Sequence, residues 1–207
     1  MTIDRTLTLE TLEVAPSDPH RLYVSGYRGV GASVTGVLLA SADDGATWTA
    51  RDIPLDPAKE KSAFIAAVDP TNPERVYVRT SGDQTSRLIV TNDAGRAFTT
   101  VFRGASLDGF ALSPDGAKVH VGGIRDGLWV ASAADFQFRR TSSVGVRCLQ
   151  RAATTPYICS SPPSGFIVGA SEDDGVMIAR KLQFDSIRGA LSLHFAFAAR
   201  TARSEIA

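Results

Sequence analysis

Long apolar runs and an excess of charge of either sign are both missing from this sequence of 207 residues. Lys and Arg together number 22, as do Asp and Glu, so the formal net charge is zero and nothing draws the chain electrostatically to nucleic acid. The longest mostly apolar run, residues 191–199, is interrupted by Ser192 and His194, which argues against membrane insertion. Residues 1–5 lack the basic start and apolar core of a signal peptide.

Patterns that bind metals or cofactors are also scarce. The three histidines are far apart in the sequence and match no zinc spacing (His20, His120 and His194). The acidic pairs Asp43-Asp44 and Asp173-Asp174 offer fewer oxygen ligands than a calcium loop needs. No phosphate-binding glycine loop or dinucleotide fingerprint is present. We therefore expect neither a metal site nor a cofactor.

One eight-residue pattern occurs three times and reads hydroxyl-x-Asp-x-Gly-x-x-bulky apolar. Its Asp carboxylate can accept hydrogen bonds from the backbone of its own turn, and its Gly can take the positive φ that other residues adopt at a cost. Strand-forming residues flank each copy, which predicts a β-hairpin. We call the three copies box turns; their pattern residues are Ser41, Asp43, Gly45 and Trp48, then Thr91, Asp93, Gly95 and Phe98, then Ser171, Asp173 and Gly175.

The spacing of these residues resembles the Asp-box, or BNR repeat, of sialidase-like and sortilin-like β-propellers. The resemblance implies an all-β chain built from four-stranded blades. It also implies that the three turns lie at the outer rim of the propeller and stabilise it, away from any central pocket. We therefore interpret Asp43, Asp93 and Asp173 as structural residues.

A second repeat supports the same organisation. Residues 14–24 align with residues 68–78 without a gap, which sets Tyr77 on Tyr23 at an offset of 54 residues. His120 stands at the corresponding place in a third unit, whose turn (132–138) lacks the Gly and is one residue short. Box starts at 41, 91, 132 and 171 have the spacing of propeller blades. The predicted blades are 6–54, 60–103, 107–142 and 144–187.

Helix is expected almost nowhere, because 18 Gly and 10 Pro cut the apolar residues into short alternating runs. Only residues 57–67 could begin a helix. We interpret them as the loop between the first two blades, with at most one helical turn, leading into a strand at 64–68.

Four blades are fewer than the six or more that propellers of the resembled families have. The chain is then a fragment of a propeller of six to eight blades, an open arc that self-associates, or a small closed ring. The absence of a closing strand before the first blade favours a fragment. Residues 191–207 match no blade position, and two interpretations stay open: a closing strand that pairs with residues 6–14, or a disordered tail.

The two cysteines, Cys148 and Cys159, fall on the expected first and second strands of the fourth blade. Neighbouring antiparallel strands bring them within bridging reach if their register agrees. The alternative is two buried free thiols. A disulfide implies an oxidising compartment, and a blade of this kind resembles secreted bacterial propellers, so the resemblance favours export although no signal peptide is present.

Catalytic residues of the resembled enzymes are not matched here. Sialidases with such repeats use three arginines, a Tyr nucleophile activated by Glu, and an acid/base Asp. The only partial match to the first arginine motif, Phe102-Arg103-Gly104, lacks its Pro and follows the second box turn. Xyloglucanase-like propellers use paired carboxylates between two propellers, and we interpret the loop residues Asp83, Asp108 and Asp126 as turn-formers instead. No catalytic residue is assigned.

The sequence therefore predicts a non-catalytic binding or scaffold module that recognises an unidentified protein or glycan. Recognition is expected through loops that join strands on one face, at 27–34, 81–85 and 125–127. The alternative is a fragment of a sialidase- or xyloglucanase-like glycoside hydrolase that lacks part of its catalytic set.

Overall fold

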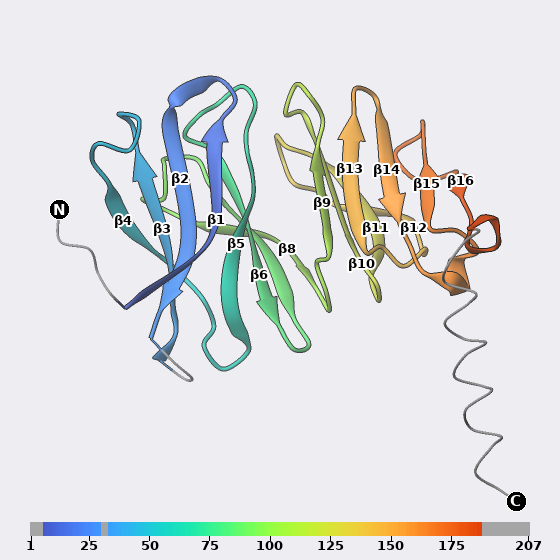
Figure 1. Ribbon diagram of the computed structural model, residues 1–207, viewed down its shortest axis with the longest axis horizontal. Helices are drawn as coiled ribbons and strands as arrows, with labels where there is room; N and C mark the ends of the chain where they lie inside the picture. Colours follow the sequence, from blue (N-terminus) through green and yellow to red (C-terminus); the bar gives the residue numbers. More distant parts are fainter. Residues whose placement is uncertain (1–5, 30–32, 188–207) are drawn as a thin grey trace, which may run out of the picture.

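The computed structural model describes residues 6–29 and 33–187. In this part the chain forms four antiparallel sheets of four strands, each made of consecutive strands in sequence order (Figure 1). Sheet 1 holds β1 (Leu7–Ala15), β2 (Asp18–Arg28), β3 (Thr35–Ser41) and β4 (Thr49–Ile53), and sheet 2 holds β5 (Glu60–Val68), β6 (Val76–Gly82), β7 (Ser86–Thr91) and β8 (Thr99–Gly104). Sheet 3 holds β9 (Gly109–Leu112), β10 (Lys118–Gly123), β11 (Gly127–Ser132) and β12 (Arg139–Ser142), and sheet 4 holds β13 (Cys148–Ala152), β14 (Thr155–Cys159), β15 (Val168–Ala170) and β16 (Ala179–Leu182).

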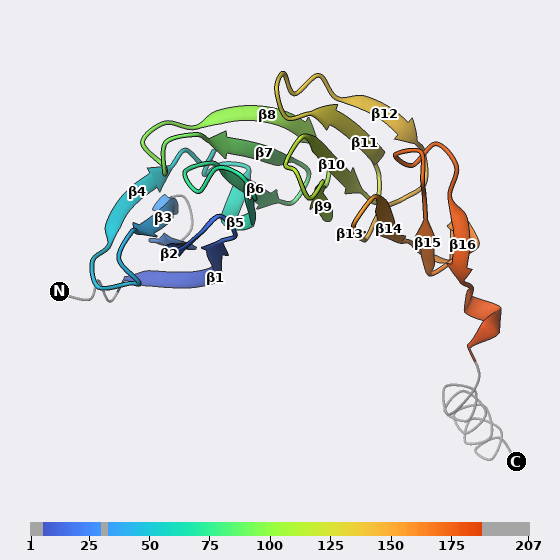
Figure 2. The same ribbon diagram turned by 90° about the horizontal axis from the view of Figure 1, so that it is seen from above.

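The four sheets follow one another along an arc. Figure 2 shows the first strands (β1, β5, β9 and β13) on the concave side of the arc and the last strands (β4, β8, β12 and β16) on the convex side. Sheets 1 and 4 lie at opposite ends of the arc. The box turns join the third and fourth strands of sheets 1, 2 and 4 and therefore lie toward the convex side.

The hydrophobic core lies between the sheets. Because side chains alternate along a strand, each sheet presents one face to the sheet before it and the other to the sheet after it. One buried cluster joins sheets 1 and 2 through residues such as Leu38 and Ile65. A second joins sheets 2 and 3 around Tyr77 and Val121, and a third joins sheets 3 and 4 around Leu128 and Ile158.

The helical segments that lie wholly within the described residues are two short 3₁₀ turns, η2 (Pro162–Ser164) and η3 (Phe184–Ser186). No helix in that part is long and apolar enough to cross a membrane. The segment considered for a helical turn, 57–67, is mostly strand instead, because β5 begins at Glu60 rather than at Phe64. The charged start of β5 is accommodated because Arg87 pairs with the buried Glu60 side chain. Residues 191–207 lie outside the described part of the chain.

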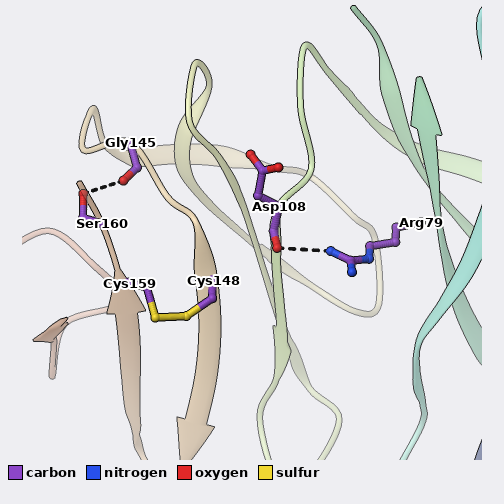
Figure 3. Close-up of a disulfide and its surroundings, with 6 residues drawn as sticks. All are labelled: Arg79, Asp108, Gly145, Cys148, Cys159 and Ser160. Atoms are coloured by element: carbon purple, nitrogen blue, oxygen red, sulfur yellow. Dashed lines mark hydrogen bonds between the residues drawn. A yellow bond between two sulfur atoms is a disulfide. The ribbon is translucent and has the colours of Figure 1, made fainter. Parts of the chain in front are cut away.

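The two cysteines form a disulfide in sheet 4. Cys148 on β13 is directly opposite Cys159 on β14, and their Cα atoms are 4.9 Å apart. Figure 3 shows the bond beside Ser160, whose hydroxyl donates a hydrogen bond of 2.6 Å to the carbonyl oxygen of Gly145. The bond thus fixes the first two strands of the terminal sheet.

Reduction of this disulfide is expected to lower the free energy of unfolding by about 2–3 kcal/mol, because the closed loop is short. The protein should show no reactive thiol when it is unfolded without reductant. Thiol counting on protein from an oxidising compartment checks this, and two reactive thiols would contradict the bond.

Candidate functional site

The three box turns share one set of hydrogen bonds. In the first, the Ser41 hydroxyl donates to Asp43 Oδ1 at 2.8 Å and accepts from the Gly45 amide at 2.9 Å, while the Thr47 amide donates to Asp43 Oδ1 at 2.8 Å. Equivalent bonds of 2.7–2.9 Å recur in the other two turns, from Thr91 to Ala97 and from Ser171 to Met177. The glycines have φ values of 83°, 89° and 95°, in the region that favours glycine.

These hydrogen bonds also lower the pKa of each box aspartate below its ordinary value. For Asp43 the main cause is the Thr47 hydroxyl, for Asp93 the amide of Ala97, and for Asp173 the amide of Met177. The three carboxylates therefore remain ionised to low pH. Their oxygens are occupied by their own turns, which suits a structural role better than proton transfer.

Two of the box turns also pack against the preceding sheet. A Cβ added to Gly95 would stand 3.0 Å from Leu38 Cδ2 of sheet 1, and one added to Gly175 would overlap Leu128 of sheet 3. Within the described residues no sheet precedes the first turn, and a Cβ added to Gly45 meets Trp48 of the same turn at 3.3 Å. These two turns therefore have two roles: each closes its own hairpin, and each packs against the sheet that precedes it.

A charged cluster forms where the third box turn meets sheet 3. Asp174 accepts hydrogen bonds from Lys118 Nζ at 2.6 Å, and its other carboxylate oxygen lies 3.1 Å from His120 Nε2. Arg151 Nη1 is 3.8 Å from the same carboxylate. Burial lowers the pKa of His120 below its usual 6.5, against the opposing effect of Asp174. The sequence placed His120 at the position of Tyr23 and Tyr77. No local pattern in the sequence pointed to its partner Asp174, which lies 54 residues later.

Protonation of His120 should cost stability in mild acid. Because its pKa is lower in the folded protein than in the unfolded chain, the unfolded chain binds the proton first as the pH falls. Stability is then complete above pH 6.5 and falls below it, by at most about 1.4 kcal/mol per pH unit. Denaturant titrations between pH 7.5 and 5.5 should show this loss as a difference in slope between the wild type and H120Q, because other titrating groups, such as His20 with its raised pKa, are the same in both proteins. Parallel slopes for the two proteins would contradict the assignment.

The loops proposed for recognition lie together at one end of the sheets. They join second and third strands, and Figure 1 places the β6–β7 and β10–β11 loops at the lower edge of the arc. The box turns lie toward the other end. Loop 27–34 belongs to the same set, although residues 30–32 lie outside the described part.

Two of the loop carboxylates at this end are engaged by backbone amides. Asp126 accepts from Ala105 at 3.1 Å and Ser106 at 2.8 Å, and Asp108 accepts from the Ile124 amide at 3.0 Å. Arg79 donates to the Asp108 carbonyl oxygen at 3.1 Å, as Figure 3 shows. These contacts brace the link between sheets 2 and 3 and match the interpretation of both residues as turn-formers.

A buried ion pair supports the neighbouring link between sheets 1 and 2. Glu60 on β5 is 1% exposed and accepts hydrogen bonds from Arg87 Nε on β7 and from the Thr80 hydroxyl, both at 2.6 Å. Burial alone would raise the pKa of Glu60, but the hydrogen bonds from Arg87, Thr80 and the Asp56 amide lower it below its ordinary value. Arg87 also donates to the Pro54 carbonyl oxygen at 2.6 Å. Sequence reasoning missed this pair because its members are 27 residues apart.

A cavity of about 410 Å³ lies at the same loop end, on sheet 2. Lys61 and Asp83 form an exposed ion pair there, with Nζ–Oδ distances of 2.6 and 2.8 Å. The remaining lining residues come from the link between sheets and from the β6–β7 loop: Pro57, Ala58, Lys59, Gln84 and Thr85. Among the described residues, no group of three His, Cys, Asp or Glu side chains is placed to hold a metal ion.

Four consecutive four-stranded antiparallel sheets, packed face to face along an arc with their first strands innermost, define the chain as a β-propeller structure. We therefore refer to sheets 1–4 as blades 1–4.

Known proteins bear out this class at the level of fold. The chain superposes on the GH74 enzyme of Niastella koreensis with a TM-score of 0.58 and 16% identity, over 83% of this chain and 29% of that one. It matches the β-propeller domain of the Trilobed protease from Pyrococcus furiosus, described as having an open velcro topology, with a TM-score of 0.57 and 8% identity, over 87% of this chain and 59% of that one.

A chain of a nidogen/laminin complex also matches, with a TM-score of 0.58, 10% identity, and coverage of 85% of this chain and 64% of that one. No protein-family model and no curated protein matches the sequence. This chain spans less than two thirds of each of these three structures. Identities this low show the shared fold alone.

Proposed function

We propose that this chain is a non-catalytic propeller module that binds a protein or a glycan through the loops at one end of its blades. The observation that carries the proposal is the contrast between two kinds of side chain at that end. Asp108, Asp126 and Glu60 are engaged in holding the blades together. Lys61 and Asp83 are exposed and line the cavity at the loop end.

The chemistry of this cavity suits a polar ligand. Lys, Asp, Gln and Thr side chains supply hydrogen-bond donors and acceptors within one opening, which fits sugar hydroxyls or a polar peptide surface. The Lys61–Asp83 pair is solvent-exposed and contributes little to folding, so its groups are available to exchange partners with a ligand.

A binding screen with one matched pair of variants tests the proposal. The protein is applied to a glycan array and to candidate surface proteins, and each hit is remeasured with K61A/D83A and with D135A. Asp135 is exposed and lies in the β11–β12 turn, away from the loop end. We expect K61A/D83A to bind at least about tenfold more weakly with unchanged melting temperature, and D135A to bind normally. Equal binding by all three proteins would contradict the proposed site.

The similarity to GH74 enzymes keeps a hydrolase fragment as the competing function. Glycoside hydrolysis generally requires two carboxyl groups poised about 5–9.5 Å apart across the scissile bond. Release of reducing sugar from xyloglucan or of sialic acid from a sialoside distinguishes the two. We expect neither, and product formation abolished by D83A would favour the hydrolase.

A further inference from the structure

Within the described part of the chain, two blade faces are open, one at each end of the arc. We call the face of a blade that meets the next blade in chain order its front face, and the opposite one its back face. Blades 1 and 2, 2 and 3, and 3 and 4 pair front to back through the three core clusters. The back face of blade 1 and the front face of blade 4 have no partner within the described residues.

The open back face of blade 1 exposes apolar side chains at positions that are buried between blades elsewhere in the arc. Val14 pairs with Leu22 as Val68 pairs with Val76 in blade 2, so the two valines are equivalent. Val68 is 5% exposed against the front of blade 1, whereas Val14 is 47% exposed. Leu12 is 62% exposed, and its equivalent Ile65 is 5% exposed. Apolar residues thus occupy positions that blade 2 uses for contact.

The open front face of blade 4 shows the complementary feature. Tyr157 pairs with the residue that directly precedes the box turn of its blade. Tyr23 and Tyr77 have the same pairing in blades 1 and 2, so the three tyrosines are equivalent. Tyr23 and Tyr77 are fully buried against the following blade, but Tyr157 is 38% exposed. Beside it is a hollow of about 610 Å³ whose lining residues all belong to blade 4, including Met177 and Lys181.

Smaller hollows lie at the same place on blades 1 and 3, where residues of the following box turn form part of the lining. On blade 1 the hollow is about 130 Å³ and is lined in part by Ala94 and Arg96 of the second box turn. On blade 3 it is about 380 Å³ and is lined in part by Asp174 of the third. Ala94 and Asp174 occupy the same place, three residues after the first residue of each turn, with φ values of 55° and 58°.

The first box turn of the chain is free to fill such a hollow. Asp44 is its residue at that place, with a φ of 56°, and its side chain is 69% exposed with only His20 as a recorded partner. On blade 3, Lys118 donates a hydrogen bond to Asp174, which is the residue of the third box turn equivalent to Asp44. On blade 4, the lysine that lines the hollow is Lys181 of β16, whereas Lys118 of blade 3 lies on the second strand, β10. Glu172 and Asp173 also line this hollow, and the carboxylate of Asp173 is occupied by its own turn.

We propose that the front face of blade 4 binds the back face of blade 1 of a second copy of this chain, with Asp44 of one copy beside Lys181 of the other. A front-to-back contact is heterologous, so two copies related by a two-fold axis form it twice and close a ring. That ring has eight blades, within the usual range for propellers. The contact continues the packing already present at three places in the arc.

Sedimentation equilibrium of the 207-residue chain tests the proposal. We expect a dimer with twice the monomer mass of 22.0 kDa. The charge reversals D44K and K181E each place like charges at both contacts, so each variant alone should dissociate with a dissociation constant at least about tenfold higher. The control D83K changes an exposed carboxylate in the β6–β7 loop and should leave the dimer intact.

An equimolar mixture of D44K and K181E provides the decisive measurement. Each contact of a mixed dimer joins opposite charges, so the mixture should recover the mass of a dimer, whereas misfolded variants would not. A wild-type chain that stays monomeric, larger assemblies in place of a dimer, or a mixture that remains monomeric would overturn the proposal. Because Lys61 and Asp83 do not take part, failure here leaves the ligand-binding proposal standing.

Discussion

Replacing Arg87 by methionine should lower the free energy of unfolding by about 3–5 kcal/mol, a larger effect than at any other single ion pair described here. The substitution leaves Glu60, which is 1% exposed, with a negative charge and no cation beside it. Thr80 and the Asp56 amide still donate to the carboxylate, but they do not neutralise it. Denaturant unfolding of the purified variant gives the value.

The dependence on pH separates a lost charge partner from lost packing. In R87M the pKa of Glu60 should rise above its unfolded value, because burial then acts without the guanidinium. A raised pKa in the folded state means that stability returns as the pH falls, so the deficit of R87M should shrink toward pH 4. The double variant E60Q/R87M removes the charge and should be more stable than R87M at pH 7. A deficit independent of pH would refute the electrostatic explanation.

Alanine in place of Gly175 should destabilise the protein by about 3 kcal/mol. Part of this comes from the φ of 95°, which costs a side chain on the order of 1–2 kcal/mol, and part from overlap of the new Cβ with Leu128 on blade 3. G45A supplies the matched control, because Gly45 has a similar φ of 83° but its added Cβ meets only Trp48 and Leu22 of its own blade, at 3.3 Å and 3.5 Å.

The difference between the two variants therefore measures the contact between blades. We expect G175A to lose more stability than G95A, whose added Cβ approaches Leu38 at 3.0 Å, and G95A to lose at least as much as G45A. Calorimetric melts of the three variants, each made in the monomeric K181E chain so that no second copy covers Gly45, give the order. Equal losses in all three would mean that the turns serve their own hairpins and nothing else.

The sequence predicted the blades because the box turn, which marks a hairpin of a blade, is recognisable from a few neighbouring residues. The hydroxyl, Asp and Gly of a box turn lie within five residues, and their hydrogen bonds are made within the turn. The all-β propeller fold follows from such turns alternating with short strands, and the structure and its matches confirm it. The offset between Tyr23 and Tyr77 likewise marked equivalent strands, and both side chains are fully buried.

Contacts between blades were beyond sequence reasoning because their partners are distant in the chain. The start of β5 at Glu60 was missed because a charged residue after Asp56-Pro57 suggests a helix start, and its neutralising partner Arg87 lies on another strand. Asp174 looked like half of an acidic pair, whereas Lys118 and His120 lie 56 and 54 residues before it. The cavity around Lys61 and Asp83 also joins two separate segments.

In blades 2 and 4, the box turn both closes its own hairpin and joins its blade to the preceding one. Hydrogen exchange at three amides tests this double role most directly, because Gly45, Gly95 and Gly175 all donate to their turn hydroxyl, at 2.9, 2.8 and 2.7 Å. In a monomeric chain, for which K181E is suited, we predict that the Gly95 and Gly175 amides exchange at least about tenfold more slowly than that of Gly45, which no blade covers. Equal exchange at the three amides would contradict the account.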